Sequence, residues 1–429
     1  MNVAHDSAQH RPLRTNRWRR RTLGGYRYVR LRWRLLFGCI DAVGGLIFAL
    51  ARWLVHPLRR HRSEAEPRRI LLVQLDHLGD AILTTGMFGP LKQRFPQAQI
   101  DVLAAPWNCD VFASVAEVDR VDVCRHVRFA PGRSLAWIPA TVIWGLRLRK
   151  RRYDLAIDVR GEFPHNLLVW LSGARRRLGW ASGGGGFLLT DKPEFVVNRS
   201  ETQSRAALLA CLGISRAEPL RPLFRPSDAA IETATHAWNE IESASERTRI
   251  VLHVGAGTPA KRWPAEHWRR LVEHLAAESE YAVALVGTSA DTPTARAILG
   301  ASTSPDAVDW TGRFGIDELA AVVKQADLLV GADSGPAHLA AAVGTPVVVL
   351  FSGTNSPGQW QPCGLRVCTL RSETPCSPCH RKTCPIGEHP CMRRIQPADV
   401  IRSLTGLLPE RLDAATTGTS STNTKGSVS

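Results

Sequence analysis

Short apolar runs alternate with amphipathic stretches along the chain after Arg69. We expect buried strands at "RILLVQL", "QIDVLAA", "YDLAIDVRG", "RIVLHVGAG", "YAVALVG", "AVDWTG", "DLLVGAD" and "VVVLF". We expect helices between them, for example at "GDAILTTGMFGPLKQRF", "PAEHWRRLVEHLAAES" and "IDELAAVVKQA". Strands that alternate with helices predict an α/β fold with right-handed βαβ units and mostly parallel sheets.

The strand–helix pattern starts twice, which predicts two doubly wound, Rossmann-like domains that face each other across a cleft. The expected division is a leader at 1–66, an N-terminal domain at 67–216, a connection with a helix at 217–245, a C-terminal domain at 246–408 and a disordered, low-complexity tail at 409–429. Ligands of such sheets bind beyond the carboxyl ends of the strands, so these positions are the first candidates for chemistry.

The leader contains one long apolar stretch, Leu35–Val55, with Arg and Trp at both ends. At about 100° per residue, Arg34, Asp41 and Arg52 fall on one line of a helix. The opposite side carries Leu36, Ile40, Val43, Ile47, Leu50 and Leu54. This pattern favours an amphipathic helix that meets an anionic inner-membrane surface through residues 30–60. A membrane span and a helix packed on the protein remain open.

The positive charge is concentrated in the same leader. The 429 residues carry a formal net charge of +16, and residues 1–69 alone hold sixteen Arg and four acids. The rest is nearly balanced and has ordinary globular composition. No nucleic-acid-binding fold follows the Arg run, so we expect no nucleic-acid partner. The sequence start has no signal-peptide pattern, so we expect a cytoplasmic protein, peripheral on the cytosolic face of the inner membrane.

The stretch "GADSGPAHLAAAVGTP" predicts a strand, a tight turn and the start of a helix. Backbone N–H groups and the positive helix end at such a turn suit a phosphate. Ser334 and the N–H of Gly335 are candidates for holding a diphosphate, with His338 one turn further along. Asp333 is expected to fix the turn or bond the ligand. A buried, purely structural histidine is the alternative for His338.

A second loop, "HVGAGTPAKRWPAEHW", occupies the equivalent position after the first strand of the second half. Its glycines allow close approach to phosphate, Thr258 is a further contact, and Lys261 adds a point charge. An exposed, uninvolved lysine is the alternative. Asp291 follows the next strand, where an acid accepts ribose hydroxyls or caps the helix that begins at Thr292.

The first half offers a carboxylate at "LDHLGDAILTT". Asp80 follows a strand and opens a helix, so it either stabilises the helix end or accepts a proton from a hydroxyl nucleophile. Asp76 and His77 are nearby rivals for that role. Asp76, His77 and Arg160 are also candidates on the acceptor side of the cleft.

Four late cysteines, Cys376, Cys379, Cys384 and Cys391, have the spacing C-x2-C-x4-C-x6-C. Four thiolates suit tetrahedral zinc, but a closed zinc site usually has two C-x-x-C pairs and only one is present. Packed or free thiols are favoured, zinc and an iron–sulfur cluster are the alternatives, and no metal is expected in the active site.

Together the motifs resemble glycosyltransferase family 9, the ADP-heptose:lipopolysaccharide heptosyltransferases. The resemblance covers about 69–407 and rests on "GDAILTT", "AKRWPAEHW", "GADSGPAHLAAAVGTPVVVLF" and "CPIGEHPCM" in that order. It implies a GT-B architecture with the donor bound mainly by the C-terminal domain. It also implies inverting, metal-independent transfer of heptose from ADP-heptose to a lipopolysaccharide core sugar on a lipid-linked acceptor, with no cofactor required.

The resemblance also implies residue roles. Asp80 matches the general base, and the donor-binding positions are Thr258, Lys261, Asp291, Asp333, Ser334, Gly335 and His338. Two other functions stay open. One is a related transferase that uses another nucleotide sugar in O-antigen or capsule assembly, and the other is a non-catalytic, membrane-associated nucleotide-sugar binding protein.

Overall fold

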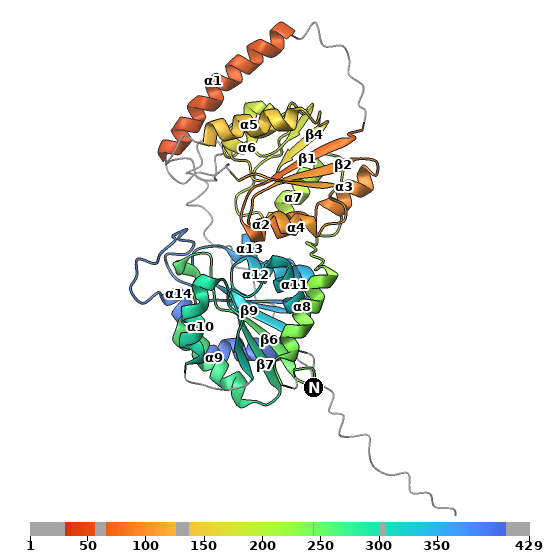
Figure 1. Ribbon diagram of the computed structural model, residues 1–429. Coiled ribbons are helices and arrows are strands. Elements are labelled where there is room, and N and C mark those ends of the chain that lie inside the picture. Colours follow the sequence, from red (N-terminus) through yellow and green to blue (C-terminus); the bar gives the residue numbers. More distant parts are fainter. Residues whose placement is uncertain (1–30, 56–65, 126–136, 243, 301–305, 409–429) are drawn as a thin grey trace, which may run out of the picture.

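The computed structural model describes residues 31–55, 66–125, 137–242, 244–300 and 306–408, which form two parallel β-sheets with helices on their faces (Figure 1). The strands of the first sheet are β1 (Arg69–Gln74), β2 (Gln99–Ala104), β3 (Arg120–Val123), β4 (Leu155–Asp158) and β5 (Arg176–Leu178). The helices around it are α1 (Leu31–Val55), α2 (Leu78–Thr85), α3 (Phe88–Arg94), α4 (Cys109–Ala113), α5 (Trp137–Arg149), α6 (Phe163–Leu171), the 3-10 helix η5 (Gly186–Leu188) and α7 (Glu201–Ala210).

The second sheet repeats the plan. Its strands are β6 (Thr248–His253), β7 (Tyr281–Val286), β8 (Ala307–Asp309), β9 (Leu328–Ala332), β10 (Val347–Phe351) and β11 (Val367–Arg371). Its helices are α8 (Asp228–Asn239), the 3-10 helix η6 (Pro259–Lys261), α9 (Ala265–Ala277), the 3-10 helix η7 (Ser289–Asp291), α10 (Thr292–Leu299), α11 (Ile316–Lys324), α12 (Gly335–Val343), α13 (Pro357–Trp360), α14 (Pro390–Arg393) and α15 (Pro397–Leu407).

The strand orders confirm the predicted doubly wound, Rossmann-like sheets. The first sheet has the order β3-β2-β1-β4-β5 and the second β11-β10-β9-β6-β7-β8. The chain reverses direction across each sheet at one point, between β1 and β4 in the first and between β6 and β9 in the second. A crevice opens at such a switch point because the connections on its two sides leave in opposite directions.

Apolar side chains of the central strands are fully buried and pack under the helices. Their continuous runs of Val, Ile and Leu are typical of strands in parallel sheets, which helices cover on both faces. The predicted helix at 79–95 is two helices instead, α2 and α3. Gly86 ends α2, and the Thr85 hydroxyl donates to the Ile82 oxygen and accepts from the Leu223 N–H. These contacts compete with continuation of the helix.

Helix α1 packs on the first sheet's helices rather than standing apart (Figure 1). Its Phe37 is 4% exposed and contacts Phe163 of α6, and Asp41 Oδ1 accepts a 2.7 Å hydrogen bond from the N–H of Gly185. The polar line of the predicted amphipathic helix therefore includes a residue that binds the protein. By length and composition, α1 is also the one helix of the described residues that is able to cross a membrane.

Candidate active site at the two switch points

The sequence-predicted residues of the first half lie around the switch point of the first sheet. Asp76, His77 and Asp80 follow β1, and Arg160 follows β4, the neighbouring strand. Asp80 lies in the first turn of α2, is 7% exposed and is 3.9 Å from Nδ1 of His77. His77 itself is exposed at the surface.

A buried arginine that the sequence analysis did not single out holds Asp80. Arg205 of α7 donates to the backbone oxygen of Asp80 at 2.9 Å, and its Nη2 lies 3.7 Å from the Asp80 carboxylate. The same guanidinium donates to Thr84 Oγ1 and to Glu201. Its fork of donors therefore fixes both the start of α2 and the direction of the carboxylate.

Asp76, which is buried, forms an ion pair with the half-buried Arg160 close to Asp80. Arg160 Nη1 lies 3.0 Å from Asp76 Oδ1, and Arg160 Nε donates to Glu162. Burial raises the pKa of Asp76 to about 7; Arg160 opposes this rise, and the carboxylate of Asp80 adds to it. The structure thus brings three of the predicted acidic and basic side chains into one cluster.

The second switch point places the amino end of α12 beside the loop after β6. Ser334 is the N-cap of α12, but within the described chain its side chain makes no cap hydrogen bond to the helix. Ser334 Oγ instead lies 3.3 Å from Nδ1 of His253, the last residue of β6. Burial lowers the pKa of His253 to about 4, which keeps the ring neutral. The first backbone N–H groups of α12 therefore receive no hydrogen bond from the N-cap side chain and are available to an anion.

Lys261 has a partner. Its ammonium donates to the carboxylate of Asp333 at 2.7 Å and to the backbone oxygen of the same residue at 2.9 Å. Asn355 donates to the Asp333 carboxylate at 2.8 Å. Asp333 therefore fixes where the lysine charge sits, next to the amino end of α12.

Two buried polar atoms of the predicted donor residues have no hydrogen-bond partner among the described residues: Oγ1 of Thr258 and Nδ1 of His338. His338 is 5% exposed, and burial lowers its pKa, whereas the carboxylates of Asp333 and Asp80 oppose the change. Buried polar groups are normally hydrogen-bonded, so each of these two atoms is available to a ligand.

The side chain of Asp291 does not cap the helix that begins at Thr292, which was one of its two expected roles. Asp291 Oδ2 instead accepts from the N–H and hydroxyl of Thr288, and its Oδ1 accepts from Arg262. A Cβ on Gly255 would stand 2.6 Å from Oδ2 of Asp291. Gly255 thus makes room for this carboxylate, whereas Gly257, the other glycine of the loop, borders open space.

The two halves touch at this place. A Cβ on Gly79 would stand 2.9 Å from Cδ2 of His338, and a Cβ on Gly335 would stand 2.7 Å from Leu78. The start of α2 and the start of α12 therefore meet across the domain boundary. The carboxylate of Asp80 is close enough to His338 of α12 to act on the pKa of that ring.

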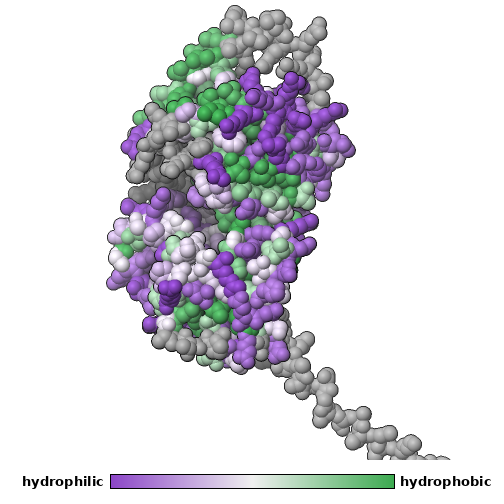
Figure 2. Space-filling view, viewed as in Figure 1, coloured by the Kyte–Doolittle hydropathy of each residue, from purple (hydrophilic) through white to green (hydrophobic). Residues whose placement is uncertain are grey.

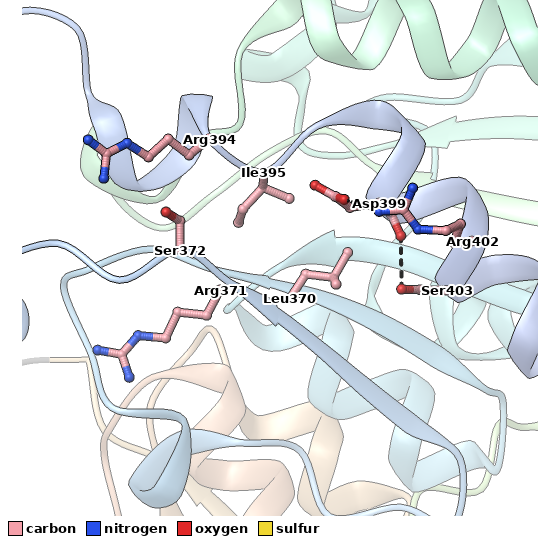
Figure 3. Close-up of a pocket in the computed structure, with 8 residues that line it drawn as sticks. All are labelled: Leu370, Arg371, Ser372, Arg394, Ile395, Asp399, Arg402 and Ser403. Carbon is pink, nitrogen blue, oxygen red and sulfur yellow. Dashed lines mark hydrogen bonds and ion pairs between the residues drawn. The ribbon is translucent and has the colours of Figure 1, made fainter. Parts of the chain in front are cut away.

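The structure does not assemble the four late cysteines. In the part of the chain that it describes, the group able to hold a metal ion by ligand spacing is Asp76, His77 and Asp80. Cys391 belongs to the apolar core, and Cys376 is exposed. A cavity of about 390 Å³ at the end of β11 includes none of the candidate residues, and Arg371, Arg394 and Arg402 are among the residues that line it (Figure 3).

A family model described as "Glycosyltransferase family 9 (heptosyltransferase)" matches residues 144–389. The chain belongs to glycosyltransferase family 9. It is 28% identical to lipopolysaccharide heptosyltransferase 2 of Escherichia coli K12, over 79% of this chain and 98% of that protein. It is 27% identical to lipopolysaccharide heptosyltransferase 1 of Pseudomonas aeruginosa, over 80% and 99%.

A solved family 9 structure from Veillonella parvula shares the fold, with a TM-score of 0.68 and 19% identity over 79% of this chain and 97% of that one. E. coli ADP-heptose LPS heptosyltransferase II shares it with a TM-score of 0.65 and 24% identity, over 79% and 98%. The predicted GT-B architecture is confirmed, and the chain is a glycosyltransferase of family 9.

Proposed function

We propose that this enzyme transfers a heptose from ADP-heptose to a lipopolysaccharide core sugar by a single, inverting displacement. The chain aligns with lipopolysaccharide heptosyltransferases over nearly their whole length, which supports this substrate class. The contact between Gly79 and His338 supports the mechanism, because it brings the start of α2, which carries Asp80, against α12.

In this mechanism the donor diphosphate binds the N–H of Gly335, the hydroxyls of Ser334 and Thr258, and Lys261. His338 contacts the diphosphate or the sugar, Asp333 holds Lys261 in place, and Asp291 accepts the ribose hydroxyls. Asp80 takes the proton of the acceptor hydroxyl as that oxygen attacks the anomeric carbon and ADP leaves. Asp76, His77 and Arg160 line the acceptor side.

The proposed reaction needs no metal ion. Lysine and the helix end supply positive charge at the diphosphate, where a metal would otherwise act. Arg160 and Arg205 neutralise the acidic cluster. The acceptor is lipid-linked, and we place the enzyme on the cytosolic face of the inner membrane, in contact with it through residues 30–60.

The test is a donor panel of ADP-heptose, other ADP-sugars and GDP-sugars with purified core acceptors, read by nucleotide release and by the anomeric configuration of the product. ADP-heptose should be used best, with inversion, and a chelator should leave the rate unchanged. Asp80→Asn should lower kcat by about 10²–10⁴-fold while ADP still binds. Preference for another sugar would support the related transferase, and binding without turnover by the wild type would support the non-catalytic alternative.

A further inference from the structure

Two helices of the described chain turn apolar side chains toward solvent on one side of the first sheet. On α1 these are Leu35, Leu36, Val43, Leu46, Ile47 and Leu50, and on α5 they are Ile138, Val142, Ile143 and Leu146. We call these residues the α1–α5 face. Figure 2 shows the hydrophobic colour gathered over α1 and the neighbouring upper end of the molecule.

Helix α1 is held in place by its opposite side. Asp41 accepts the hydrogen bond from Gly185, and Phe48 contacts Phe187 of η5 and Trp170 of α6. Gly44 lets Phe187 approach, because a Cβ there would collide with that ring. The exposed side of α1 is therefore the side that the protein does not use.

Helix α5 belongs to the same layer. Trp137 of α5 and Phe37 of α1 both contact Phe163 of α6, at ring distances of 6.4 and 5.8 Å. Gly145 brings α5 close to α6, since a Cβ there would collide with Leu171. Both helices thus rest on α6, and their exposed apolar side chains form one surface.

The positive charges next to the α1–α5 face indicate which kind of partner binds there. Arg147 and Arg149 of α5 and the following Lys150 are exposed at one end, and Arg32 is exposed at the start of α1. A second protein surface of neutral apolar character would leave these cations unpaired, whereas anionic headgroups pair with them while the acyl boundary takes the apolar side chains.

We propose that the α1–α5 face is a monotopic anchor that lies in the headgroup region of an anionic phospholipid bilayer. The inference deepens the proposed membrane contact of residues 30–60 by adding α5, a helix of the folded domain, and by making Asp41 a latch that keeps α1 flat. A helix latched by a side chain to Gly185 does not cross the bilayer. The anchor holds the first sheet at the membrane.

The test uses the full-length protein and vesicles of phosphatidylethanolamine and phosphatidylglycerol in a flotation assay. The double variant Ile143→Glu/Leu146→Glu should lower the vesicle-bound fraction at least about tenfold, because it places two charges in the apolar layer. Removing Arg147 and Arg149 should lower binding about fivefold each at low salt. Leu365→Glu, at a residue 87% exposed on the second half, is the matched control and should bind as the wild type does.

Wild-type binding by the α5 double variant would overturn the proposal. A change from dimer to monomer in that variant, with vesicle binding intact, would assign the face to a second copy of the chain. Heptose transfer to a water-soluble core fragment needs no membrane contact and is measured separately. Loss of the proposed activity can therefore be distinguished from loss of the anchor.

Discussion

The guanidinium of Arg205 donates a 2.9 Å hydrogen bond to the backbone oxygen of Asp80. The arginine is 2% exposed, and its other donors bind Thr84 and Glu201. Glu201 in turn accepts from Gln359 of α13, which lies between β10 and β11 of the second sheet. Arg205 therefore joins the start of α2 to α7, and through Glu201 to the opposite half of the molecule.

Arg205→Lys should lower kcat about 10- to 100-fold while the KM for the donor changes less than about twofold. Lysine keeps the charge but not the planar fork, so the Asp80 carboxylate shifts by a fraction of an ångström or more, and small misplacements of a catalytic group are expensive in rate. Steady-state kinetics with varied ADP-heptose measures both constants.

Arg313→Lys is the control, because Arg313 pairs with Glu240 on the exposed surface. It should leave kcat and KM unchanged. Equal loss of kcat in both variants, or a loss in Arg205→Lys that follows its thermal unfolding, would show that Arg205 acts only on stability.

Lys261→Met should weaken ADP binding about 10- to 100-fold, since a charge-assisted hydrogen bond contributes about 1.5–3 kcal/mol. The loss should shrink as salt is raised, because the interaction is between charges. Asp333→Asn should move the lysine and lower kcat as well, because the Asp333 carboxylate holds the ammonium at 2.7 Å.

Titration calorimetry with ADP measures these affinities. Lys324→Met is the control, an exposed lysine at the last turn of α11, on the side of the sheet away from the carboxyl strand ends. Unchanged ADP affinity in Lys261→Met would remove the lysine from the donor site.

The central strands were predictable because their apolar runs are buried on both faces. β3, β5 and β11 were not predicted: β3 is the half-exposed "RVDV", and β5 has three residues. Such edge strands form because a neighbour is already in place, as β3 does along β2. The local pattern of four residues does not contain that information.

In the candidate site, too, residues in local motifs were predictable and residues brought in by the fold were not. Motif residues on loops after strands, such as Asp80 and Ser334, were found because strand ends of parallel sheets meet. Arg205 was missed because it lies 125 residues from Asp80 and sits in an ordinary helix pattern. His253 was missed because it ends an apolar strand and looks like core.

Gly79→Ala should disrupt the contact between the two halves. Its Cβ would stand 2.9 Å from Cδ2 of His338, too close for any real pair, so the His338 ring, α2 or α12 must move. We expect kcat to fall about tenfold or more, because the base and the donor site separate. Fold stability should change little, since alanine is favourable inside a helix.

Gly89→Ala in α3 is the matched control, because nothing lies within 4 Å of the added Cβ. It should keep full activity and stabilise slightly. Wild-type kcat in Gly79→Ala would mean that the reacting enzyme holds the two halves further apart than this structure does.

Asp76 makes stability depend on pH. Its pKa is raised from 3.8 to about 7 in the folded chain, so the folded state keeps a proton that the unfolded state has already released in this window. The free energy of unfolding should therefore fall as pH rises from about 4 to 7, by at most about 1.4 kcal/mol per pH unit, and then level off. Arg160 opposes the shift, as does His165, while Asp80 and Glu162 favour it.

Asp76→Asn should remove this slope, because an amide exchanges no proton over the same range. Urea unfolding of both proteins at several pH values between about 4.5 and 8 measures it. Asp110→Asn, at an exposed position on α4, should keep the wild-type slope. If the slope survives in Asp76→Asn, the proton belongs to another member of the cluster, and the ion pair with Arg160 keeps Asp76 charged throughout.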